Sequence, residues 1–130
     1  MISFKKFKKI INIILDKEKT SQLNSLEITE VIKFFRIKEF QGFIFSSKIY
    51  DLKNNYGFYL LLIENDDNNE ISHWIAIYHS NYFNYYYDPL GKPPKIKYFE
   101  KYKWNDDKTQ YDGTITCGYY CLYFIYSLSK

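Results

Sequence analysis

The segment CGYYCLYFIYS, over residues 117–127, constrains the fold more than any other part of the sequence, because it is almost wholly apolar and carries no charge. A helix that is apolar all round is a core helix. The chain has 130 residues, which is enough for one domain. The sequence therefore predicts a single core built around this C-terminal helix.

Four shorter segments predict β-strands. One of them is a continuous apolar run bounded by two asparagines and an acidic loop, which is typical of a strand buried on both faces. The last predicted strand ends at Asp88-Pro89, because proline cannot continue a central strand. The predicted strands are residues 40–45, 56–63, 73–79 and 81–87.

The N-terminal segment predicts an amphipathic helix. Its apolar residues recur at helical spacing and its lysines lie largely off that stripe; the apolar residues are Phe7, Ile10, Ile11, Ile14 and Leu15. We expect this helix to pack on the domain with a solvated basic face, while contact with a membrane surface or nucleic acid stays open. Residues 1–23 are accordingly treated as a basic helix with a connector, and residues 24–130 as the compact domain.

A second helix is predicted before the strands. Asn24 followed by Glu27 is typical of an N-cap with its capping partner, and the helix should end near Arg36. A short helix is also expected near residues 96–102, followed by a polar, loop-like segment over 103–113.

The composition narrows the class of protein. Tyr, Phe and Trp make up 22 % of the chain, so a small domain has enough apolar area to fold without disulfides. Cys117 and Cys121 are one helical turn apart and cannot easily bridge, which suits free thiols in a reducing compartment. The net charge of +3 is too mild to require nucleic acid. No apolar run suits a transmembrane helix, and the N-terminal segment is a poor secretory signal.

Polar and reactive side chains interrupt the apolar pattern in a definite order. His73 begins a strand, Asp88 ends the next, Gln110 lies in a loop, and Cys117 begins the apolar helix. A helix N-terminus favours a thiolate, and a nearby imidazole can take the thiol proton. A carboxylate on the far ring nitrogen would hold the tautomer, and adjacent antiparallel strands can bring Asp88 to His73. The Cys117 N–H and the Gln110 amide could then bind an oxyanion.

Each of these residues also has a structural interpretation. Alone, His73 is more often a structural histidine, Asp88 a turn residue and Gln110 uninformative. His79 lies on a similar face of the same strand, and we expect it to be structural or exposed. Cys121 should pack as a small apolar side chain. A zinc site made of two His and two Cys is disfavoured, because their spacing does not match that of structural zinc sites.

Taken in order, these residues resemble the adenovirus-type maturation proteases, the adenain family, with relatives in Polinton-like elements and virophages. The SUMO-deconjugating cysteine proteases are more distant relatives. The similarity extends roughly from Asn24 to the C-terminus. It rests on His73-Trp74, Asp88-Pro-Leu-Gly91, Gln110 and Cys117-Gly118-x-x-Cys121.

The resemblance implies an α+β, papain-like cysteine protease domain, with a central Cys-bearing helix packed on a small, mostly antiparallel sheet. It implies thiol endopeptidase activity, usually after small residues such as Gly, and assigns the catalytic roles to His73, Asp88, Gln110 and Cys117. Trp74 would form part of the wall of a narrow substrate cleft. No metal and no cofactor is implied.

The same resemblance implies a biological role. The substrates would be viral or capsid precursor proteins, cleaved by a monomer in the cytoplasm or nucleus of an infected cell or in the virion. Two alternatives stay open, an isopeptidase that removes a ubiquitin-like modifier and a non-catalytic binding module with the same fold. Weak nucleic-acid contact through the N-terminal lysines is also left open.

Overall fold

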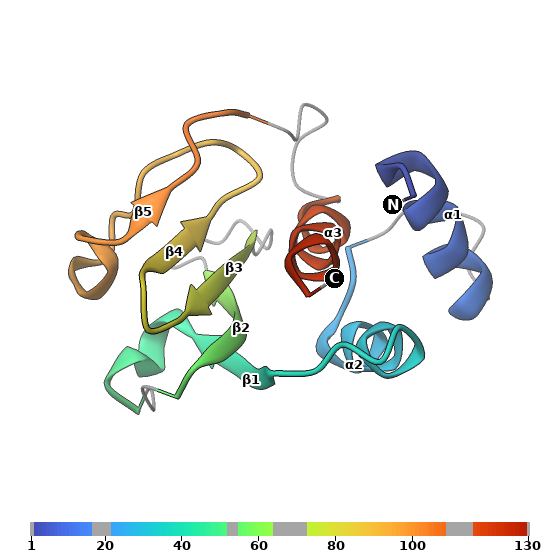
Figure 1. Ribbon diagram of the computed structural model, residues 1–130, viewed down its shortest axis with the longest axis horizontal. Coiled ribbons are helices and arrows are strands. Elements are labelled where there is room, and N and C mark those ends of the chain that lie inside the picture. Colours follow the sequence, from blue (N-terminus) through green and yellow to red (C-terminus); the bar gives the residue numbers. More distant parts are fainter. Residues whose placement is uncertain (1, 17–21, 52–54, 64–72, 109–115, 130) are drawn as a thin grey trace.

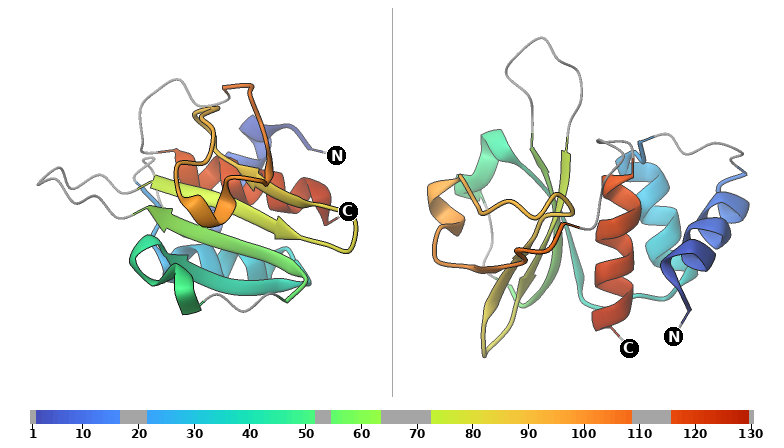
Figure 2. Two further views of the ribbon diagram at one scale, coloured as in Figure 1. Left: turned by 90° about the vertical axis from the view of Figure 1, so that its left-hand side faces the viewer. Right: turned by 90° about the horizontal axis from the view of Figure 1, so that it is seen from above.

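Helix α3 (Cys117–Leu128) lies between a five-stranded sheet on one side and helices α1 (Phe4–Ile14) and α2 (Ser25–Phe34) on the other (Figures 1 and 2). The computed structural model describes residues 2–16, 22–51, 55–63, 73–108 and 116–129, and over these ranges the chain is an α+β protein. The predicted core helix is confirmed, because its side chains Tyr119, Leu122 and Ile125 have no exposed surface.

The sheet is mixed, which corrects the expectation of a mostly antiparallel one. Its strand order is β1-β2-β3-β4-β5, with antiparallel pairing of β2 with β3 and of β3 with β4. The two outer pairings are parallel, because the chain returns through the short 3-10 turns η1 (Ser46–Asp51) and η2 (Lys97–Phe99) before it pairs again. The strands are β1 (Phe40–Phe45), β2 (Gly57–Ile63), β3 (His73–His79), β4 (Asn84–Tyr87) and β5 (Lys103–Trp104).

Apolar side chains cover both faces of the sheet. Leu60 points into the cluster that the sheet shares with the three helices, and its neighbour Leu61 points into a second cluster on the opposite face with Ile75 and Phe99. Successive residues of a strand face opposite sides. The prediction that β2 is buried on both faces is therefore confirmed for its first five residues.

The two N-terminal helices form as the sequence predicts. The Asn24 side chain accepts a hydrogen bond from the Glu27 N–H at 2.8 Å, and the Glu27 carboxylate accepts one from the Asn24 N–H at 3.0 Å. In α1, Phe7 and Ile11 are fully buried in the core shared with α3, and Phe4 stacks on Tyr120 with ring centroids 4.0 Å apart. The amphipathic stripe of α1 thus packs directly on the core helix.

Three elements differ from the prediction by more than one or two terminal residues. Strand β4 begins at Asn84 instead of residue 81, because the Ser80 hydroxyl accepts hydrogen bonds from the backbone N–H groups of Tyr82 and Phe83 and so forms a turn. The helix expected near residues 96–102 is the 3-10 turn η2. Strand β5, two residues long, lies inside the segment predicted to be a loop.

His79 is a structural residue, as predicted. It is 1 % exposed, and its Nε2 lies 2.6 Å from the Tyr102 hydroxyl. Burial lowers the pKa of His79 below its ordinary value, because the charged imidazolium loses its hydration.

This burial predicts a pH dependence of stability. Since the folded-state pKa of His79 is lowered, the unfolded chain takes up the proton first, and stability falls as the pH drops through about 6.5. His79→Phe should reduce the difference between the urea midpoints at pH 7.0 and pH 5.5. An unchanged difference in the variant would contradict a neutral, buried His79.

Candidate active site

His73 and Asp88 meet at one end of the sheet. Nε2 of His73 lies 2.6 Å from Oδ1 of Asp88, and the side chains are 15 % and 7 % exposed. A carboxylate only accepts hydrogen bonds, so Nε2 carries the proton and donates it. The predicted approach is confirmed, because antiparallel pairing brings the start of β3 beside the end of β4.

The backbone around Asp88 is fixed by a second set of hydrogen bonds. The carboxylate also accepts from the Leu90 N–H at 2.8 Å, which aims Oδ1 toward the turn and the imidazole. The Asn105 side chain accepts from the Asp88 N–H at 2.8 Å and donates to the Asp88 carbonyl at 2.6 Å. Asn105 follows β5 and was not predicted as a site residue, since an asparagine in a polar segment gives no signal of a partner 17 residues away.

Cys117 is the first residue of α3 and reaches the same end of the sheet. Its Sγ accepts a hydrogen bond from the backbone N–H of Trp74 at 3.3 Å. Because Trp74 directly follows His73, this bond holds the thiol next to the residue that carries the imidazole. A backbone N–H aimed at sulfur and the N-terminal end of a helix both favour negative charge on that sulfur.

The second nitrogen of His73, Nδ1, is buried and has no hydrogen-bond partner among the residues that the structure describes. Burial lowers the pKa of His73, but hydrogen bonding and charge from Asp88 and Cys117 outweigh it and raise the pKa to about 9. The Cys117 thiol thus raises the pKa of the ring, although its contact with Nδ1 does not reach the geometry of an ordinary hydrogen bond. Such contacts are often loose before substrate binds.

Cys121 anchors the same strand from one helical turn further on. Its thiol donates a hydrogen bond to the Trp74 carbonyl at 3.3 Å and is fully buried, as predicted for a core side chain. Burial raises the pKa of Cys121 well above its ordinary value, so it stays a neutral thiol. The two cysteines of α3 thus take both backbone polar groups of Trp74, beyond the point where β3 and β4 stop pairing.

Burial of the candidate nucleophile is the feature least typical of a reactive thiol. Cys117 has no exposed surface in this structure. Reactive cysteines generally lie in partly exposed positions. A substrate carbonyl would therefore reach Sγ only after neighbouring side chains move.

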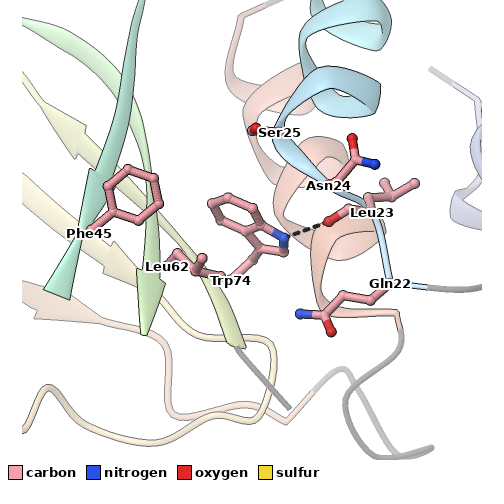
Figure 3. Close-up of a pocket in the computed structure, with 7 residues that line it drawn as sticks. All are labelled: Gln22, Leu23, Asn24, Ser25, Phe45, Leu62 and Trp74. Carbon is pink, nitrogen blue, oxygen red and sulfur yellow. Dashed lines mark hydrogen bonds between the residues drawn. The ribbon is translucent and has the colours of Figure 1, made fainter. Parts of the chain in front are cut away.

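Trp74 lines a pocket of about 330 Å³ beside the start of α2 (Figure 3). Its indole N–H donates to the Leu23 carbonyl at 2.9 Å, and Phe45 and Leu62 form the facing apolar wall. Gly118 permits this packing, because a Cβ at that position would lie 3.2 Å from the Leu23 Cβ and 3.4 Å from the Trp74 ring. Trp74 therefore contributes to the wall of a pocket.

Gln110 lies outside the described residues. Over the residues that the structure describes, no three His, Cys, Asp or Glu side chains are grouped to hold a metal ion. His73 and His79 lie at opposite ends of β3, so the two His and two Cys do not converge. No helix in the described ranges combines the length and apolar character needed to cross a membrane.

Comparisons with known proteins do not place the chain in a family. No protein-family model matches the sequence, and neither the curated proteins nor the solved structures gave a match.

Asn105 offers a test of how Asp88 is held. Asn105→Ala removes both hydrogen bonds to the Asp88 backbone and should cost roughly 1–3 kcal/mol of stability. With Asp88 less firmly held, the pKa of His73 should fall from about 9 toward 6.5, as read from the ring resonances by NMR. Asp88→Asn, which removes the charge altogether, sets the lower reference.

Asn84→Ala, at the exposed start of β4, is the matched control and should leave the His73 titration unchanged. If Asn105→Ala is less stable but His73 still titrates at about 9, Asn105 has no part in positioning Asp88.

Proposed function

We propose that this chain is a cysteine endopeptidase with a papain-like arrangement, similar to the adenovirus-type maturation proteases. One observation carries the proposal. His73 has Nε2 bound to Asp88 and Nδ1 without a partner, and the next residue donates its backbone N–H to Cys117 at the start of α3. A base with one nitrogen anchored and the other free, beside a thiol at a helix N-terminus, is the arrangement that nucleophilic thiol catalysis needs.

In the first half of the reaction, the thiol proton of Cys117 passes to Nδ1 of His73, which gives the thiolate–imidazolium pair that a His73 pKa of about 9 favours. Sγ then attacks the carbonyl carbon of the peptide, and the carbonyl oxygen becomes an oxyanion. As the C–N bond breaks, the imidazolium returns its proton to the leaving amine and a thioester remains on Cys117. Asp88 stabilises the imidazolium throughout, which agrees with the direction of the His73 pKa shift.

In the second half, His73 takes a proton from water, and the resulting hydroxide attacks the thioester carbon. The new intermediate collapses, the carboxylic acid leaves, and Cys117 regains its proton. The backbone N–H of Cys117, at the first helical position, is available to stabilise each oxyanion. Gln110 is the proposed second donor, by the resemblance of its position to the family pattern.

The pocket beside Trp74 supports a peptide substrate. It combines the apolar wall of Phe45, Leu62 and Trp74 with polar side chains at residues 22, 24 and 25 (Figure 3). The backbone N–H of Trp74 is the group that binds Cys117. The acyl part of a substrate would lie here. Cleavage after small residues such as Gly follows from the family resemblance, as does the role in processing viral precursor proteins.

The burial of Cys117 favours a second candidate, a non-catalytic binding module with the same fold. A thiol without exposed surface can simply fill core volume and accept the Trp74 N–H. In that case the pocket beside Trp74 would bind a peptide without cleaving it. An isopeptidase specific for a ubiquitin-like modifier would use the same residues on a folded substrate.

The proposal is tested by exposing the protein to a peptide library derived from a whole proteome and identifying new termini by mass spectrometry. Wild type should cleave, whereas Cys117→Ser should lose at least about 10³-fold in rate because the hydroxyl is not activated as the thiol is. Thermal unfolding confirms that the variant is folded.

Equal cleavage by wild type and Cys117→Ser would contradict the proposal. Cleavage of folded modifier fusions alone would indicate the isopeptidase. Binding of peptides without cleavage, unchanged in Cys117→Ser, would indicate the binding module.

A further inference from the structure

A second pocket lies behind the His73–Asp88 pair, on the face of the sheet opposite α3. It holds about 290 Å³, and both His73 and Asp88 form part of its wall. The rest is largely apolar, with Lys92 and Lys95 exposed beside it. The apolar lining consists chiefly of Ile63, Ile75, Tyr86, Leu90 and Ile96.

The charges around this pocket favour an anionic occupant. Among the described residues that line it, Asp88 is the only acidic one, and its charge is directed to His73 at 2.6 Å. No other described residue of the lining therefore neutralises Lys92 and Lys95. An occupant that presents a large apolar group together with a carboxylate matches both the lining and the charge.

The pocket lies where the part of a peptide substrate that follows the cleaved bond would be expected. The leaving nitrogen must come within about 3 Å of His73 Nδ1 to receive its proton. Each extended residue adds up to about 3.3–3.6 Å, so the first two residues after the cleaved bond can reach a pocket whose wall includes His73.

The pocket beside Trp74 serves the opposite side of the reaction. Leu62 lines it, whereas the next residue of β2, Ile63, lines the pocket behind His73. Neighbouring strand residues point to opposite faces, so the two pockets flank the same end of the sheet. The Trp74 backbone that binds Cys117 lies between them.

Resting on the proposed function, we infer that the pocket behind His73 and Asp88 binds the substrate segment that follows the cleaved bond, and that it selects a large apolar residue with an acidic neighbour. Its volume of about 290 Å³ is roughly twice that of a core cavity that accepts benzene, which is enough for one large side chain. The two lysines would pair with the acidic neighbour at the rim.

The test compares cleavage-site profiles of Lys92→Glu/Lys95→Glu with those of wild type in the proteome-derived peptide library. Wild type should favour acidic residues within two positions after the cleaved bond, and the double variant should reduce that preference about five-fold. Lys5→Glu/Lys9→Glu, the same charge change on the exposed face of α1, is the control and should leave the profile unchanged.

A second variant tests the apolar part. Ile96→Trp fills the pocket from the wall away from the sheet, and it should shift cleavage toward small residues after the cleaved bond while the residues before the bond stay the same. The weaker acidic preference of Lys92→Glu/Lys95→Glu and the preference of Ile96→Trp for small residues would together support the subsite.

Each other outcome has a separate meaning. If cleavage depends on Cys117 but the profile after the bond does not change in these variants, the subsite is wrong and the proposed function stands. If the rate changes equally for all peptides, the pocket acts on the His73–Asp88 pair as an effector site, which also overturns the subsite. If wild type shows no Cys117-dependent cleavage, the proposed function and the subsite both fail.

Discussion

The attachment of β3 to α3 through the backbone of Trp74 is the interaction on which the candidate site depends. Cys117 accepts the Trp74 N–H and Cys121 donates to the Trp74 carbonyl, each at 3.3 Å, so one turn of the helix fixes the first residues of the strand. His73 is then beside the helix N-terminus by direct chain connection. Gly118 and the bond from the Trp74 indole to Leu23 extend this attachment to the start of α2. The two cysteines lie on one face of the helix but bind Trp74 in opposite senses, since Cys117 accepts a hydrogen bond and Cys121 donates one.

Burial and nearby charge act in opposite directions on the protonation of His73. Burial alone would favour a neutral His73, yet Asp88 and Cys117 together raise its pKa to about 9. A protonated imidazole in a half-enclosed site is sustained only by negative charge nearby, and Asp88 supplies it with its own geometry fixed by Asn105 and the turn at Leu90. The same enclosure leaves Cys117 without exposed surface. The burial of Cys117 goes with the packing of the strand end against α3, whereas the raised pKa of His73 comes from Asp88 and Cys117.

The sequence predicted most helices and strands, because each of them forms for a reason that lies within its own segment. The capping residues Asn24 and Glu27, the apolar run of β2 and the uncharged segment of α3 each carry their own signal. The approach of His73 to Asp88 was also predictable, since it follows from two adjacent strands. Strand β5 and the Asn105 bridge were not, because a two-residue strand and a side-chain contact to a distant backbone depend on the folded chain alone. The mixed character of the sheet was missed for a similar reason, because it is set by the path of the connections through η1 and η2.

Activation of Cys117 by His73 can be measured by residue-resolved alkylation with iodoacetamide. Rates at Cys117 and Cys121 would be followed from pH 5 to pH 10 by mass spectrometry, in wild type and in His73→Ala. Cys117 should react below neutral pH in wild type, Cys121 should stay inert, and His73→Ala should move the reaction of Cys117 toward the pH of an ordinary thiol, about 8.5. If Cys117 is inert at every pH, or reacts only near that ordinary value in both proteins, His73 does not activate it.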